Sequence, residues 1–131
     1  MGAPQSDHQS EQAPDAFHAG IREFNHRRFF EAHEAWEAIW LRSSEPDKTF
    51  LQGIIQIAAA FHHHSRGNRG GACSLLLAGL RRVQPFPGSY FGIDLQSLRD
   101  QASAWATMLT SGSPDSHTLS LPQIKLVPKR H

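Results

Sequence analysis

The stretch that indicates the fold class most clearly is FFEAHEAWEAIWL, residues 29–41. With about 100° between successive residues of a helix, one broad apolar face carries Phe29, Ala32, Trp36, Ile39 and Trp40. His33 and Glu37 fall inside this face or at its edge, and a separation of four residues stacks their side chains on one side of the helix. The stretch therefore predicts an amphipathic helix that carries polar groups beside its apolar face.

Four further segments repeat apolar residues every three or four positions, which is typical of helices. We expect these helices at about 15–25, 47–66, 69–83 and 95–109. Asp15, Asn68 and Asp94 are available as N-caps, and Gly67 is available to end the helix before it. The link at 26–28 is so short that the first two helices should form an antiparallel hairpin. The sequence thus predicts an all-α fold, a compact bundle of about five helices, with no regular strand.

The length and composition indicate one folded unit with two less regular ends. A chain of 131 residues, 39% of them hydrophobic, is too short for two cores. Residues 1–14 are polar and lack periodic apolar positions, so we expect a disordered leader there. We expect the helical bundle domain at 15–110 and an extended tail at 111–131, because Pro122 and Pro128 disfavour a central strand.

Charge and cysteine content limit the cellular setting and the partners. The formal net charge is +1, so no strong field would concentrate nucleic acid or anionic lipid at the surface. The lone Cys73 cannot form an intramolecular disulfide, and we see neither a secretory signal nor a membrane-spanning apolar run. We therefore expect a cytoplasmic protein, monomer or homodimer, that binds neither nucleic acid nor membrane. A small-molecule ligand stays open as a partner.

A second group of polar residues lies on the helix expected at 47–66. Its apolar stripe is formed by Leu51, Ile54, Ile55, Ala58 and Phe61. His62 falls in the middle of this stripe and His63 on its flank. If this helix packs antiparallel to the one at 29–41, His62 should contact His33, with Glu37 one turn away. A histidine or carboxylate on an apolar face needs a partner, because burying it unpaired is costly.

The string HEAWE, residues 33–37, resembles the zinc-peptidase pattern HExxH with a carboxylate in the last position. On this interpretation His33, Glu37 and His62 bind a divalent metal, zinc, manganese or iron, and Glu34 is the catalytic base that deprotonates a bound water. Two other interpretations stay open. One is a hydrogen-bonded network in the core, in which His33 and Glu37 form a buried pair that His62 and a flanking Gln complete; the other is a pocket for an organic ligand or a partner. The run His62-His63-His64 cannot bind one ion with all three rings, which point about 100° apart.

Several short motifs together resemble a known family. They are Phe24-Asn25, FFEAHE at 29–34, Glu37, Trp40, LQG at 51–53, AAAFH at 58–62, Gly67-Asn68 and Gly71-Ala72. Over about residues 17–109 the chain is similar to the domain of unknown function 309 family of prokaryotes and plastids. The resemblance implies a small all-helical bundle, in a family sometimes labelled a metal-dependent hydrolase. It also implies that any site of the family would use Glu31, His33, Glu34, Glu37 and His62.

The chain departs from this family in its first hairpin, where the family often has glycine and this chain has His26-Arg27-Arg28. If one of these residues must be left-handed, it costs about 1 kcal/mol relative to glycine. The pair His63-His64 looks particular to this chain, so we carry no ligand role onto it. Two functions remain in view: a metal-dependent hydrolase of a small substrate, and a non-enzymatic binding or assembly module in which the polar cluster is structural.

Overall fold

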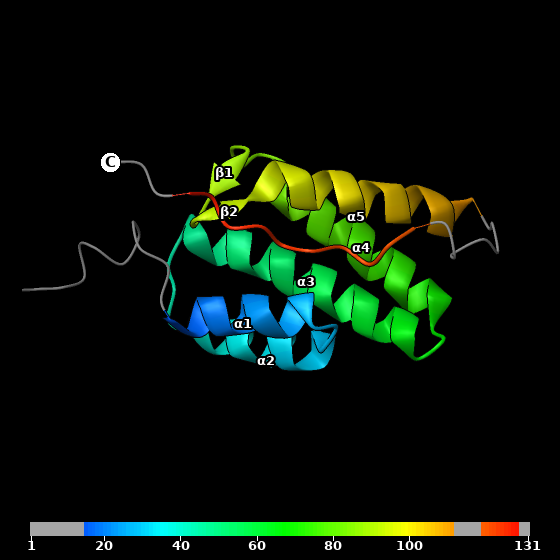
Figure 1. Cartoon of the computed structure of the whole chain (residues 1–131), viewed down its shortest axis with the longest axis horizontal. Coiled ribbons are helices and arrows are strands. Elements are labelled where there is room, and N and C mark those ends of the chain that lie inside the picture. Colours follow the sequence, from blue (N-terminus) through cyan, green and yellow to red (C-terminus); the bar gives the residue numbers. More distant parts are fainter. Residues whose placement is uncertain (1–14, 112–118, 129–131) are drawn as a thin grey trace, which may run out of the picture.

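The computed structural model describes residues 15–111 and 119–128, and its regular structure is almost entirely helical (Figure 1). The helices of this part are α1 (Asp15–Asn25), α2 (Phe29–Trp40), α3 (Asp47–Ser65), α4 (Arg69–Val83) and α5 (Leu95–Thr110). The expected all-α bundle of about five helices is confirmed. The expected leader at 1–14 lies outside the described residues.

A short β-hairpin corrects the expectation that all regular structure is helical. Strand β1 (Ser89–Tyr90) pairs antiparallel with β2 (Ile93–Asp94). The two residues between them both have positive φ, 56° at Phe91 and 82° at Gly92, as the tightest hairpin turns require. Two-residue strands are too short to show an alternating pattern, so periodicity could not reveal them.

The α1–α2 hairpin is built around a left-handed arginine and a buried tryptophan. Arg27 has φ 68°, so it is the left-handed residue of this turn. Its strain costs about 1 kcal/mol relative to glycine. Trp36 is fully buried, and its indole N–H donates to the backbone oxygen of Phe17, 3.1 Å away. The hairpin therefore gains a specific hydrogen bond inside its core.

The turn that joins α3 and α4 contains the predicted helix-ending glycine and the predicted N-cap. Gly67 has φ 80°, and the Asn68 side chain accepts a hydrogen bond from the Gly71 N–H at 3.0 Å. Further along, a Cβ on Gly79 would lie 2.6 Å from the backbone oxygen of Gly53. The two helices thus pack backbone against backbone, which only residues without side chains allow.

Helix α5 covers the side of the bundle that lies away from the α1–α2 hairpin, and the tail runs beside it (Figure 1). The Asp94 side chain caps α5 by accepting from the Ser97 N–H at 3.0 Å. The described tail, 119–128, runs extended along α5 back toward the β-hairpin (Figure 1). Ile124 is buried, and its backbone N–H and oxygen are both bonded to the Asn25 side chain. The tail is therefore an integral part of the core.

Two polar contacts, one made by the buried Arg99 and one by the half-buried Tyr90, link the elements near the β-hairpin. Arg99 of α5 is 8% exposed and donates to the backbone oxygens of Val83 at 2.8 Å and Phe86 at 2.7 Å. The Tyr90 hydroxyl donates to Asp47 at 2.6 Å, and burial together with this bond raises the pKa of Tyr90 above its ordinary value. Both contacts link the segment after α4 to neighbouring helices.

The arrangement of α2 and α3 positions the candidate site. The turns α1–α2 and α3–α4 lie at the same end of the molecule, opposite the β-hairpin (Figure 1). The first turn of α2 therefore meets the last turn of α3, where the Phe30 and His62 ring centres are 5.3 Å apart. Within the described ranges, no helix has the length and apolar character needed to cross a membrane.

Candidate functional site

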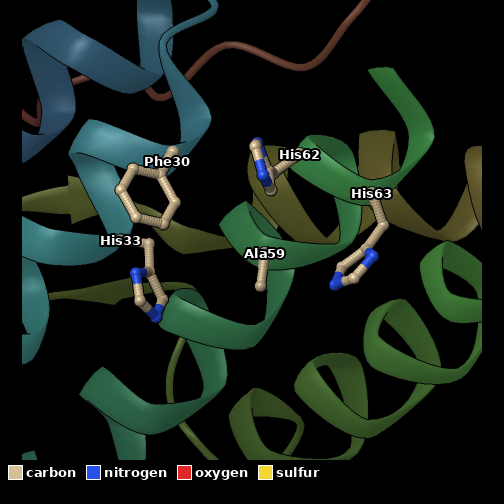
Figure 2. A pocket seen from close by; sticks show the side chains of 5 residues that line it. All are labelled: Phe30, His33, Ala59, His62 and His63. Carbon is tan, nitrogen blue, oxygen red and sulfur yellow. The ribbon is translucent and has the colours of Figure 1, made fainter. Parts of the chain in front are cut away.

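A small pocket lies between the start of α2 and the end of α3 (Figure 2). Its volume is about 120 Å³, and it is lined by Phe30 and His33 from α2 and by Ala59, His62 and His63 from α3. The expectation of a histidine site across these two helices named His33 and His62, and the structure brings both to this pocket. Phe30, Ala59 and His63 also line it, although the sequence analysis assigned them no role.

The α2 wall of the pocket is aromatic. The Phe30 ring is 45% exposed and stacks on the His33 ring, with centres 5.7 Å apart and an angle of 27° between the planes. The same phenyl ring contacts His62, so His33 and His62 share Phe30 as a neighbour. The Nδ1 atom of His33 is buried and has no hydrogen-bond partner among the described residues. A buried polar atom without a partner is uncommon and calls for an explanation.

On the α3 wall, three successive histidines turn to three different neighbours. His62 contacts Phe30, and His64 contacts the Trp105 ring of α5 at a centre distance of 4.9 Å. His63 lies 3.0 Å from the Asn68 amide nitrogen through its Nδ1 atom. The rings diverge as the helical spacing of about 100° per residue requires, and only His62 and His63 line the pocket.

The carboxylates predicted for the site lie outside the pocket. Glu31, Glu34 and Glu37 are all exposed, and none of them lines it. Glu37 is four residues after His33, which turns it about 40° farther from the centre of the buried face. The expected buried pair of His33 and Glu37 is therefore not formed, and the core network interpretation is corrected at this point.

His62 also lies elsewhere than the sequence suggested. It is half-buried, at the edge of the α3 core face and not in its middle. The buried face of α3 is wider than the predicted stripe, because α2 and α4 pack on different sides of it. Phe50, Gly53, Ile57 and Ala60 are buried as well, so the centre of the face moves away from His62.

The predicted metal ligands do not fit one ion as they are placed. In residues 15–111 and 119–128, no three side chains of His, Cys, Asp or Glu are grouped so that they could hold a metal. His33 and His62 both line the pocket, whereas Glu34 and Glu37 are exposed to solvent and do not line it. Metal binding by His33, Glu37 and His62, with Glu34 as base, stays a prediction.

The segment of the chain that supplies the α3 wall of the pocket contains no acidic residue. From residue 48 to residue 93 the chain has no Asp or Glu, and its charged residues are Lys48, Arg66, Arg69, Arg81 and Arg82. The α3 wall of the pocket belongs to this segment. The acidic residues of α2 lie outside the pocket, so the imidazoles that line it face no carboxylate within the pocket.

The part of the chain that contains the pocket is similar to known proteins. Residues 17–75 match the model of a family described as "Domain of unknown function (DUF309)". A Bacillus subtilis (strain 168) protein described as "Uncharacterized protein YpuF" is 36% identical over 73 residues, which are 54% of this chain and 42% of that protein. The chain thus covers less than half of this relative's length. The family resemblance is confirmed, and all five pocket residues lie within the matched range.

Proposed function

Since residues 17–75 of this chain match the model of the DUF309 family and include every residue of the pocket, we propose that the chain is a non-enzymatic helical binding module. In this proposal, the pocket of α2 and α3 receives one acidic side chain of a partner protein. The observation that carries the proposal is that three imidazole rings from two helices line one pocket that contains no carboxylate.

The size of the pocket favours a single side chain over a whole small molecule. Sites for drug-sized ligands measure roughly 300–1,000 Å³, whereas this pocket measures about 120 Å³. An Asp or Glu side chain has only a few heavy atoms and fits such a volume. The half-exposed Phe30 at the rim offers an apolar surface on which the rest of a partner can pack.

The chemistry of the walls favours an acidic group. A neutral imidazole carries one N–H, so His33, His62 and His63 can each donate a hydrogen bond to an occupant when the protonated nitrogen faces the pocket. A carboxylate accepts such bonds more strongly than a neutral oxygen does, because the bonds are charge-assisted. The segment 48–93, which supplies the α3 wall, contains no carboxylate that could repel an acidic group, and Arg66 follows the pocket histidines within one helical turn. A partner with a protruding Asp or Glu is therefore complementary to the pocket in hydrogen bonding.

We expect N-acetyl-glutamate amide to bind the pocket in the millimolar range, while N-acetyl-glutamine amide binds more weakly. A difference of about 1 kcal/mol for the charge corresponds to about a five-fold difference in Kd. Amide ¹H–¹⁵N spectra recorded during titration measure both affinities, and the shifts should centre on Phe30, His33, Ala59, His62 and His63. The control is Ala59→Leu, which fills the pocket with a good helix former and should abolish the shifts.

Three results would overturn this function. Equal affinity for the glutamate and glutamine compounds, or shifts that survive in Ala59→Leu, would show that no acidic side chain is selected at the pocket. The third comes from a separate titration with zinc: shifts at His33, Glu37 and His62 with a raised Tm would favour the metal site, since a ligand that binds only the folded state raises stability.

A further inference from the structure

The His63 ring is tied to the cap of the next helix by two linked hydrogen bonds. The Asn68 Oδ1 atom accepts from the Gly71 N–H at 3.0 Å, and the Asn68 Nδ2 atom lies 3.0 Å from Nδ1 of His63. One amide group therefore serves the first turn of α4 and a ring that lines the pocket. The cap alone was visible in the sequence, while the bond to His63 was not.

The two bonds fix which end of the amide faces the histidine. If the amide were reversed, its NH₂ group would face the Gly71 N–H, and two donors would meet. With the oxygen held by the cap, the NH₂ group faces His63 and can only donate. Nδ1 of His63 is then the acceptor, and the neutral ring carries its proton on Nε2.

The ring geometry directs this proton away from Asn68. Nδ1 and Nε2 are separated by one ring carbon and their bonding directions diverge widely, so Nε2 does not face the α3–α4 turn when Nδ1 does. Figure 2 shows the His63 ring turned toward Ala59, across the pocket from His33. The Nε2–H of His63 is thus available to an occupant of the pocket as a donor in a fixed direction.

Gly71 makes room for this arrangement. A Cβ on Gly71 would lie 2.5 Å from the Asn68 Nδ2 atom and 3.0 Å from its Cγ atom. A Cβ on the adjacent Gly70 would meet no atom within 4 Å, so the close approach to Asn68 is specific to Gly71. Because Gly71 has no side chain, the Asn68 amide can lie close to the backbone at the start of α4.

We infer that Asn68 is a positioning residue that holds His63 as an Nε2–H donor and thereby selects hydrogen-bond acceptors, a carboxylate above all, for the pocket. The inference rests on the proposed binding function for its ligand class. Its first part, the state of the His63 ring, can be measured without any ligand.

The substitution Asn68→Asp separates capping from positioning. Asp caps helices about as well as Asn, so α4 keeps its first turn, but a carboxylate has no N–H to donate. His63 must then donate through Nδ1, which leaves the Nε2 lone pair facing the pocket. Long-range ¹H–¹⁵N spectra of the ring nitrogens at about pH 9, above the range in which histidine titrates, should show Nε2–H in the natural protein and Nδ1–H in the variant.

The chain contains its own control for this spectrum. The Nδ1 atom of His26 lies 2.7 Å from the backbone oxygen of Arg22, so His26 must donate through Nδ1. It should show the Nδ1–H pattern in both proteins, opposite to His63 in the natural chain. If His63 gives the same pattern in both proteins, or the Nδ1–H pattern in the natural chain, the positioning role of Asn68 is overturned.

Titration with N-acetyl-glutamate amide completes the test. We expect Asn68→Asp to weaken binding at least ten-fold, because a donor is lost and a negative charge is added near the pocket. If the His63 pattern reverses and the affinity is unchanged, the selection of acceptors by His63 is overturned while the binding function stands. If the natural protein shows the expected His63 pattern but binds no glutamate compound, the binding function itself fails and the selection fails with it.

Discussion

Replacement of Gly20 with alanine should lower the free energy of unfolding by about 3 kcal/mol, the upper end of the usual range for an overpacked core. A Cβ at this position would lie 2.2 Å from Nε1 of Trp36 and 2.6 and 2.7 Å from two further indole atoms. Trp36 is fully buried and donates to the Phe17 oxygen, so it cannot move aside without losing that bond. The close approach of α1 and α2 therefore depends on glycine.

Denaturant unfolding of the variant, followed by circular dichroism, measures this loss. The matched control is Gly70→Ala in the first turn of α4, where an added Cβ meets nothing within 4 Å. Alanine is the better helix former, so the control should gain up to about 1 kcal/mol. A loss below about 1 kcal/mol for Gly20→Ala would mean that α1 and α2 are packed less closely than described.

Replacement of Arg99 with methionine should cost about 3 kcal/mol, because hydrogen bonds to a charged group contribute strongly and their loss leaves buried acceptors unpaired. Arg99 is 8% exposed and donates to the backbone oxygens of Val83 and Phe86 and to the Gln96 side chain. Methionine keeps the apolar stem of the side chain and removes every donor. The chain after α4 would then lose its main polar attachment to α5.

The informative control for this residue is Arg99→Lys. Lysine keeps the charge but lacks the planar fork, in which one nitrogen reaches the backbone oxygens and the other reaches the Gln96 side chain. Its unfolding free energy should fall between those of the natural chain and the methionine variant. A methionine variant as stable as the natural protein would show that the bonds of Arg99 contribute nothing net.

The helices and their ends were largely readable from the sequence because the signals for them are local. Apolar spacing located α4 at its observed bounds, Arg69–Val83. The caps predicted at Asn68 and Asp94 both form, since a cap depends only on residues within one turn. In the first hairpin the sequence did not decide whether a residue is left-handed, and the structure shows that Arg27 is.

The site was predicted only in part, because it depends on how far each helix face is covered by its neighbours. His33 and His62 do line one pocket, but Glu37 is exposed and His62 is only half-buried. A helical wheel gives the direction of a side chain and not the width of the contact that covers it. The contacts of Arg99 join residues more than a dozen positions apart, and no local pattern marks them.

The claim that His33 and His62 are placed for binding and not for folding is tested most directly by unfolding His33→Ala, His62→Ala and the double variant in chelator. Both rings contact Phe30, and no hydrogen bond joins them in the described part of the chain. We therefore predict losses below about 1 kcal/mol each, and losses that add in the double variant. Losses of about 2 to 4 kcal/mol each that are strongly non-additive would contradict the claim, because they would show a coupled structural network.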